Sequence, residues 1–188
     1  DPFCGMNMGM TAEVLSREFK ISREAQDEFA NRSHQKASAA MKEGKFKAEI
    51  LPLLCGDKLS KLLTNDVGPR DNSTVEGLAK MKPYFDKKAG TVTIGNSCPI
   101  TDGGSVFLIC SEKALKEHNL KPMARMIDFH FHGLEPERMG MGPLLAMNGL
   151  FERTSMSLAQ MDLVEINEAF AAQVLAVRRG LQDEKVAR

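Results

Sequence analysis

The sequence has little of what marks membrane-spanning or nucleic-acid-binding proteins. Its 188 residues include no Trp and one Tyr, and no apolar run approaches the roughly 20 residues that a membrane-spanning helix needs. Basic and acidic residues balance at 25 each, which argues against a dedicated nucleic-acid surface. We therefore expect one globular domain or two small ones, with no membrane span and no nucleic-acid partner.

Cysteine is scarce, and its spacing follows no metal or disulfide pattern. The four cysteines, at positions 4, 55, 98 and 110, form no CxxC pair, so we expect no metal site and a reduced, intracellular setting. His130 and His132 alternate in the sequence, but no third ligand lies near them. The chain begins with Asp1-Pro2 rather than Met and lacks a signal-peptide pattern, so we expect it to begin within a domain.

Helical signals dominate the first half of the chain. Residues 11–19 predict a short helix, and Ser22 is a typical N-cap for a second, longer one. Apolar residues recur there at helical spacing until Gly44, which favours a stop. His34 lies in this helix and His118 in a later one, and we expect both side chains to be exposed. Residues 45–54 indicate an edge strand or loop, and 55–72 a polar loop with turn signals.

Strand and helix signals alternate in the second half, as in an α/β layer. A capping box at Ser73–Glu76 predicts a brief helix that ends before Pro83. The stretch 106–110 is unbroken in its apolarity, which predicts a strand buried on both faces. The charged tail, 178–188, is expected to fray. Strands are predicted at 91–94, 106–110, 124–131 and 163–166, and helical segments at 111–118, 143–152, 157–160 and from Ala169 onward.

The joint between the last strand and the last helix carries two polar residues, Asn167 and Glu168. In an open α/β sheet, ligands collect at the carboxyl ends of strands. Asn167 could serve a ligand there or could cap the following helix. Glu168 could act as a general base, although a structural carboxylate near the helix N-terminus is the stronger interpretation.

Four blocks, in the same order as in that family, resemble the thiolases, enzymes that make or break a carbon–carbon bond in acyl-coenzyme A thioesters. The resemblance covers nearly the whole chain. The blocks are Gly5-Met6-Asn7-Met8-Gly9-Met10-Thr11-Ala12-Glu13, then Lys82-Pro83-Tyr84-Phe85-Asp86 with Gly90-Thr91-Val92-Thr93 and residues 96–103, then Met139-Gly140-Met141-Gly142-Pro143, and finally Asn167-Glu168-Ala169-Phe170-Ala171.

The resemblance implies an α/β chain that is part of the layered thiolase fold. In that family, two similar α/β halves are stacked and a helix-and-loop domain is inserted in the first half. Residues 1–100 would form a partial loop domain, 101–120 the end of the N-terminal half, and 121–188 the start of the C-terminal half, with its strand-helix units. The chain would then be about half of an ordinary family member.

The resemblance also implies roles for individual residues. Asn167 would hold a water that donates to the enolate oxygen, beside a histidine that is absent here. Arg70 would lie near the adenine, where a guanidinium can stack on a ring or pair with phosphate. Met8, Phe85, Met139 and Phe170 could equally be plain core. The residues implied to contact substrate or coenzyme A are Met8, Arg70, Phe85, Cys98, Ile100, Met139, Ala169 and Phe170.

Three features set the chain apart from a complete family member. Asn7 stands where many members have histidine, and Cys98-Pro99 replaces a common Ser-Gly. The nucleophilic cysteine block, the glycine-rich histidine block and the second-cysteine block are missing, so we expect the isolated chain to be inactive. The alternative is a non-catalytic module that binds acyl-CoA or lipid. A ketoacyl synthase ranks lower, because it would use histidine at the position of Asn167.

The expected partners follow from the same resemblance. They are acyl-CoA and coenzyme A, the latter as a substrate rather than as a cofactor, and we expect no other cofactor. The full-length protein would form a homodimer or homotetramer. It would be cytoplasmic in a bacterium, and mitochondrial or peroxisomal in a eukaryote.

Overall fold

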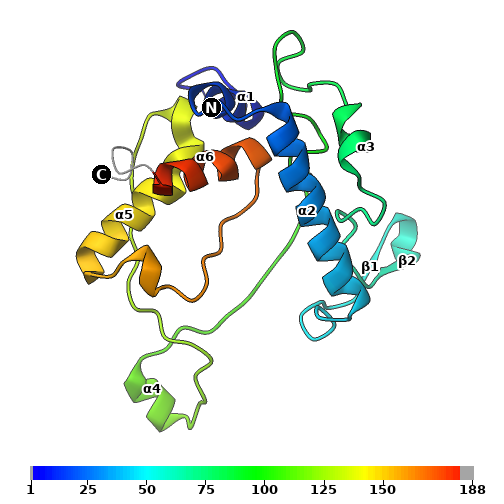
Figure 1. Ribbon diagram of the computed structural model, residues 1–188. Coiled ribbons are helices and arrows are strands. Elements are labelled where there is room, and N and C mark those ends of the chain that lie inside the picture. The colour runs from blue at the N-terminus through cyan, green and yellow to red at the C-terminus, as the bar shows by residue number, and fades with distance from the viewer. Residues whose placement is uncertain (1, 183–188) are drawn as a thin grey trace.

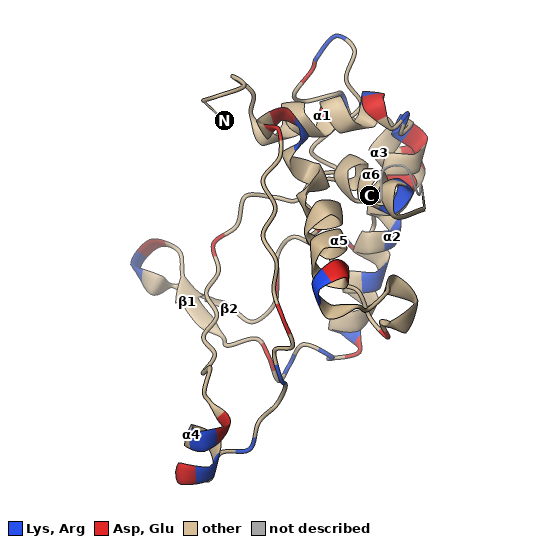
Figure 2. Cartoon of the chain, turned by 90° about the vertical axis from the view of Figure 1, so that its left-hand side faces the viewer, with Lys and Arg blue, Asp and Glu red and all other residues tan. Residues whose placement is uncertain are grey.

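The computed structural model describes residues 2–182, and helices dominate it. Helices α1, α2, α5 and α6 lie together, with α3 beside α2 (Figure 1). Helix α4 projects away from them at the end of two long irregular segments, as two views at right angles show (Figures 1 and 2). The elements are α1 (Met8–Glu18), α2 (Arg23–Lys42), β1 (Leu53–Cys55), η1 (Asp57–Leu59), β2 (Lys61–Leu63), α3 (Val75–Ala79), α4 (Glu112–Glu117), η2 (Pro136–Met141), α5 (Gly142–Thr154), η3 (Leu158–Gln160) and α6 (Ala171–Gln182).

The first two helices confirm the sequence-based predictions. The Ser22 hydroxyl caps α2 by accepting the Ala25 N–H at 3.2 Å. Glu43 is the C-cap of the helix, and Gly44 follows with a φ of +71°, a left-handed conformation that glycine adopts without steric cost. At the start of α1, the Asn7 side chain accepts the Met10 N–H at 2.9 Å and so acts as an N-cap.

The later helices agree with prediction except at the N-termini of α3 and α6. Pro143 lies in the first turn of α5, and Ser157 with Gln160 forms the expected capping box. Helix α3, however, is capped by Thr74 rather than Ser73, because the Thr74 hydroxyl accepts the Gly77 N–H at 3.0 Å. Of the tail expected to fray, residues 178–182 are helical in α6, and 183–188 lie outside the described residues.

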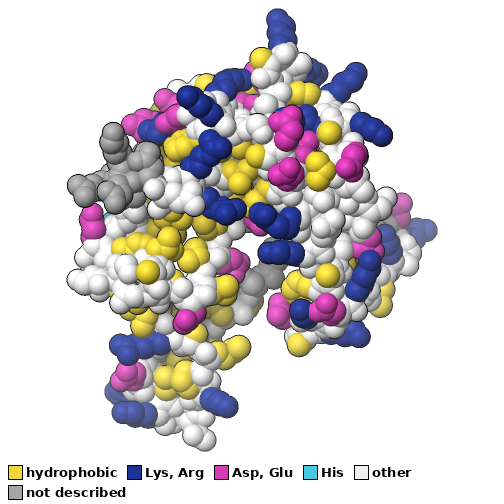
Figure 3. Space-filling view, in the orientation of Figure 1, with side chains coloured by type: hydrophobic (Ala, Val, Ile, Leu, Met, Phe, Trp, Pro, Cys, Tyr) yellow, Lys and Arg dark blue, Asp and Glu magenta, His cyan; other side chains and the backbone are white. Residues whose placement is uncertain are grey.

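The four predicted strands are wrong as local structure. Residues 91–94, 106–110, 124–131 and 163–166 carry no strand assignment. The stretch expected to be buried on both faces is open instead, with Phe107 76% exposed and Leu108 78% exposed. A strand needs a neighbour to share its backbone hydrogen bonds, and these apolar segments have no ladder partner among residues 2–182. Apolar side chains therefore lie on the surface around α5 and beside α4 (Figure 3).

The ladder that does form is a short antiparallel hairpin. Strand β1 pairs with β2 in the register Leu53–Leu63, and η1 makes the connection. Its residues come from the stretches in which the sequence predicted an edge strand or loop and then a polar loop. A hairpin this short depends on packing or on neighbours for its stability.

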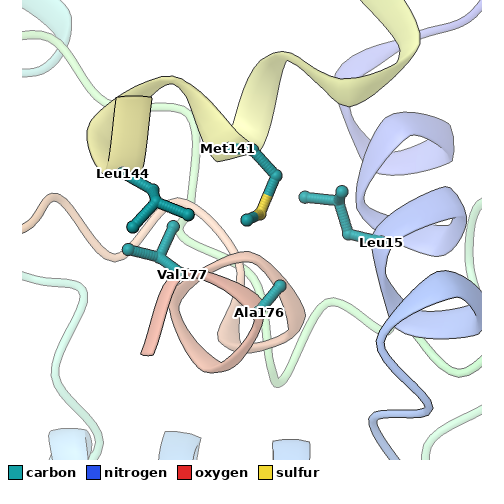
Figure 4. Close-up of a cluster of buried hydrophobic side chains, with 5 residues drawn as sticks. All are labelled: Leu15, Met141, Leu144, Ala176 and Val177. Carbon is teal, nitrogen blue, oxygen red and sulfur yellow. The ribbon is translucent and has the colours of Figure 1, made fainter. Parts of the chain in front are cut away.

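The largest buried apolar cluster joins α1, the η2–α5 region and α6. Leu15, Met141, Leu144, Ala176 and Val177 form it, and their side chains converge between the helices (Figure 4). The methionine–glycine segment before α5 thus packs on the last helix of the chain. At Gly140, an added Cβ would lie 2.7 Å from Leu15 and 2.9 Å from Gln173, so glycine permits this close approach.

A second region is fixed by a buried carboxylate rather than by apolar packing. The Glu13 side chain, 1% exposed, accepts the N–H groups of Thr91 and Val92, each at 2.8 Å, and the Thr91 hydroxyl at 3.2 Å. Charge-assisted bonds to backbone amides are strong, and their loss leaves buried donors without partners. Glu13 therefore ties α1 to the segment that the sequence predicted as a strand.

We expect Glu13→Ala to lower the free energy of unfolding by about 3 kcal/mol, because the buried Val92 N–H and the partly buried Thr91 N–H lose their acceptor. Urea unfolding followed by circular dichroism measures this change. Glu28→Ala, the same substitution at an exposed position on α2, is the control and should change stability by less than about 0.5 kcal/mol. Equal effects in the two variants would contradict the structural role of Glu13.

Candidate functional site

The site is built where two segments far apart in the sequence run side by side. Ser97 and Phe170 form an isolated antiparallel bridge. The Cys98 N–H donates to the Ala169 carbonyl at 2.9 Å, and the Ala171 N–H donates to the Asn96 carbonyl at 2.9 Å. Three of the residues implied by the resemblance, Cys98, Ala169 and Phe170, are thereby brought together.

Aromatic packing extends this junction to Phe85. The ring centroids of Phe85 and Phe170 lie 5.9 Å apart in an edge-to-face arrangement, a geometry that aromatic pairs prefer. Both rings pack against the buried cluster of Ala12, Val92 and Ala172. The Phe85 ring also covers Gly9, where any Cβ would clash with it. Glycine at the start of α1 is thus required for the wall that Phe85 forms.

A pocket of about 220 Å³ opens beside the junction, between α2 and residues 95–99. Drug-sized ligands occupy pockets of roughly 300–1,000 Å³, so this pocket admits one part of such a ligand. Its polar side chains include Ser33, His34 and Glu168, and the Ser33 hydroxyl donates to the Glu168 carboxylate. The lining residues are Phe29, Ala30, Ser33, His34, Ala37, Gly68, Pro69, Gly95, Asn96, Ser97, Cys98, Pro99, Glu168 and Ala171.

Glu168 has the structural partner that the sequence favoured, and it lies three residues before α6. The carboxylate thus links the segment before α6 to α2. Glu168 and His34 both line the pocket. The negative charge of Glu168 favours the imidazolium and partly offsets the lowering of the His34 pKa by burial and by Arg70.

His34 was predicted to be exposed, and this prediction is wrong. The residue is partly buried in the pocket wall, and its Nδ1 accepts the backbone N–H of Arg70 at 3.3 Å. Burial lowers the pKa of His34, the Arg70 charge lowers it further, and the Glu168 charge opposes them. The sequence held a signal for this position, because Ala30, His34 and Ala37 share one helix face. His118, by contrast, is exposed at the end of α4, as predicted.

The other residues implied by the resemblance lie outside the junction. Ile100 is fully exposed, two residues beyond Cys98, while Met8 is 62% and Met139 42% exposed. Arg70 is exposed and reaches the pocket through its backbone contact with His34. Met8 begins α1 and Met139 lies in η2, and these two elements contact each other.

Asn167 is exposed in the irregular segment that precedes α6. The interpretation that it caps this helix is wrong, because α6 begins at Ala171 and the Phe170 carbonyl accepts the Val174 N–H at 3.1 Å. The bridge between Ser97 and Phe170 moves the start of the helix beyond the polar residues. The Asn167 amide therefore has no role as the cap of α6.

Two further findings concern residues 2–182. Their helices include none that is both long and apolar enough to cross a membrane. Within the same residues, no group of three His, Cys, Asp or Glu side chains could hold a metal ion.

The histidine pair at 130 and 132 packs beside α5. The His130 and His132 ring centroids lie 6.2 Å apart, and an added Cβ on Gly149 of α5 would clash with the His130 ring.

The fold and the site together define a class of protein. The model of the thiolase N-terminal domain matches residues 1–113, and that of the thiolase C-terminal domain matches residues 120–187. The chain belongs to the thiolase family. The predicted α/β thiolase fold is confirmed, although the expected strands do not form within the described residues.

Individual members of this family are similar to the chain over nearly its whole length. A probable acetyl-CoA acyltransferase of Staphylococcus aureus (strain COL) is 43% identical over 184 residues, which cover 97% of this chain and 47% of the relative. The crystal structure of the Bacillus anthracis acetyl-CoA acetyltransferase matches with a TM-score of 0.90 at 40% identity, covering 100% of this chain and 48% of that one. The structure of human mitochondrial 3-ketoacyl-CoA thiolase in complex with CoA matches with a TM-score of 0.83 at 37% identity, covering 98% and 46%. The chain spans about half the length of the curated relatives it matches.

The pocket yields a prediction about His34. Glu168→Gln is expected to lower the pKa of His34 further, because a charge that favours the imidazolium is removed, and Arg70→Ala is expected to raise it. Titration of the imidazole protons by nuclear magnetic resonance measures both changes. The pKa of His34 in the folded state lies below its ordinary value. Stability contributed by the neutral imidazole is therefore lost as the pH falls from above the ordinary pKa to below the folded-state pKa.

The matched control is Glu165→Gln, which removes a carboxylate from an exposed position three residues away. Its effect on the pKa of His34 should be smaller than that of Glu168→Gln. A pKa that rises in Glu168→Gln, or an equal fall in both variants, would contradict the arrangement of charges in the pocket.

Proposed function

We propose that this chain is a segment of a thiolase-type acyl-CoA C-acyltransferase. The full-length protein would cleave 3-ketoacyl-CoA with coenzyme A, or run the reverse Claisen condensation of acetyl-CoA. The observation that carries this proposal is the junction of residues 96–98 with 169–171, which joins two blocks of the family pattern beside a pocket. Relatives named as acetyl-CoA acyltransferases support it.

The chemistry requires a nucleophile that holds the acyl group, a base that deprotonates an acetyl carbon, and donors that stabilise the enolate oxygen. We assign the last task in part to Asn167, whose neutral amide can orient a water toward a developing oxyanion. Its exposed position before α6 leaves the amide available for this role. The nucleophilic cysteine and its base would come from the rest of the full-length protein, as would partner strands for the exposed apolar segments.

The coenzyme A arm would run along the junction. Cys98 and Ala169 supply a narrow wall through their backbones, and Phe85 and Phe170 supply an apolar one. Pantetheine carries amides that suit backbone partners. Ile100 would border the same arm. Ala169 and Phe170 would also line the thioester pocket, and Met8 and Met139 would form part of its wall, with exposed side chains that can close on a ligand. Arg70 would lie toward the adenine. Coenzyme A is a substrate here, and the proposal includes no other cofactor.

The organisation of the chain follows from the same proposal. Residues 1–100 would belong to the loop domain, 101–120 to the end of the N-terminal half and 121–188 to the C-terminal half. The full-length protein would be a homodimer or homotetramer. It would act in the cytoplasm of a bacterium, or in the mitochondria or peroxisomes of a eukaryote.

The isolated chain is expected to show no thiolysis of acetoacetyl-CoA above the buffer rate, whereas the full-length protein is expected to catalyse it. The assay follows the loss of the acetoacetyl-CoA absorbance after coenzyme A is added. Turnover by the chain alone would contradict the assignment of the nucleophile to the rest of the protein. Binding of coenzyme A without turnover by the full-length protein would favour a non-catalytic acyl-CoA module instead.

In the full-length protein, Asn167→Ala is expected to lower kcat by roughly 10²–10³-fold, the usual cost of losing one oxyanion donor. The Michaelis constant should change much less, because the interaction forms mainly in the transition state. Asn72→Ala, at an exposed position near α3, serves as the control and should leave kcat unchanged. An unchanged kcat in Asn167→Ala would overturn the catalytic role.

A further inference from the structure

A buried aspartate of α2 lies behind the junction and has no place in the proposed chemistry. The Asp27 side chain is 1% exposed. Its Oδ2 accepts the Arg23 Nε–H at 2.7 Å, and its Oδ1 accepts the Asn96 side-chain N–H at 3.0 Å. Since a buried carboxylate is costly unless it is paired and hydrogen-bonded, this arrangement needs an explanation.

Asn96, 2% exposed, uses all of its polar groups. Its side-chain amide donates to Asp27 and, at 3.2 Å, to the Thr91 carbonyl, while its Oδ1 accepts the Thr93 N–H at 2.8 Å. Its backbone N–H donates to the Thr93 hydroxyl, and its carbonyl accepts the Ala171 N–H at 2.9 Å. Side chain and backbone together therefore allow little movement of this residue.

The other end of the network is equally fixed. Arg23 donates to the carbonyls of Leu78 and Met81, at 2.6 and 2.9 Å, where α3 ends. The chain of contacts thus runs from α3 through Arg23, Asp27 and Asn96 to the start of α6. Each link is a hydrogen bond, so the network holds Asn96 at a defined place relative to α2 and α3.

We propose that Asp27 and Asn96 are positioning residues, which hold the wall formed by residues 96–98 and 169–171 at the distance that a coenzyme A arm requires. The coenzyme A part of this inference rests on the proposed function. Neither side chain would touch the reacting atoms. Asn96 and Ala171 line the pocket, so a shift of their shared hydrogen bond moves the pocket wall directly.

The chemistry of the pair explains why these two residue types are needed. Asp27 offers acceptors only, and both of its oxygens face donors. At position 96, the side chain must donate twice and accept once, which a carboxylate cannot do. Asp27→Asn places the N–H donors of an amide against another donor, either Arg23 or Asn96. Asn96→Asp places two carboxylates next to each other. The double exchange, Asp27→Asn with Asn96→Asp, restores a donor and an acceptor across the same gap.

The experiment compares the two single variants and the double exchange in the full-length protein. Hydrogen exchange measured by mass spectrometry on peptides covering 96–99 and 169–173 reports the junction, and peptides from α1 report global stability. Calorimetric titration with desulfo-coenzyme A, which lacks the reactive thiol, reports affinity. Asp57→Asn, at an exposed position in η1, the connection of the hairpin, is the matched control.

In each single variant, we expect the junction peptides to exchange faster while the α1 peptides stay as in the wild type. Affinity for desulfo-coenzyme A should fall about tenfold, the cost of about one lost hydrogen bond. The double exchange should recover part of both effects, and the control should show neither.

Equal acceleration in α1 and at the junction would overturn the proposal, because it would reveal only a loss of global stability. Unchanged junction exchange with unchanged affinity would overturn it as well. If the wild type fails to bind desulfo-coenzyme A, the proposed function fails. The exchange pattern then still decides whether Asp27 and Asn96 fix the wall.

Discussion

Two buried carboxylates hold the segment 91–98 in place, and the candidate site depends on that segment. Glu13 of α1 binds the backbone N–H groups of Thr91 and Val92, and Asp27 of α2 binds the Asn96 amide. Apart from the bridge between Ser97 and Phe170, the segment pairs with no strand among residues 2–182, so side chains supply acceptors that a ladder would otherwise provide. Because these carboxylates are buried and their hydrogen bonds are charge-assisted, they restrain the backbone of the segment.

Residues 91–98 form the site by binding the backbone at the start of α6. The Asn96 carbonyl receives the Ala171 N–H, and Ser97 forms the bridge with Phe170. The same contacts place Phe170 against Phe85 and bring Glu168 to Ser33 and His34. Hydrogen bonds from α1 and α2 to residues 91–98 thus help to determine where Asn167 and Glu168, before α6, lie.

The sequence predicted the helices well because their signals are local. The Ser22 cap, Gly44 and the Ser157 capping box lie within one turn of the ends they define. A strand depends on partners that are distant in the sequence. The apolar stretch around Phe107 therefore predicted a buried strand, but none of the described residues pairs with it. For the site, the family resemblance named Cys98, Ala169 and Phe170, and the structure brings these three residues together. Their contacts with substrate or coenzyme A stay a prediction. The resemblance did not reveal His34, Asp27 or Glu13, whose roles depend on contacts across 36 to 79 positions in the sequence.

The most direct test is a crystal structure of the full-length protein with coenzyme A. We expect that residues 96–98 still pair with 169–171, that Glu13 and Asp27 keep their hydrogen bonds, and that the pantetheine arm lies along this wall. A structure in which coenzyme A binds elsewhere, or in which the pairing of Ser97 with Phe170 is absent, would contradict this expectation.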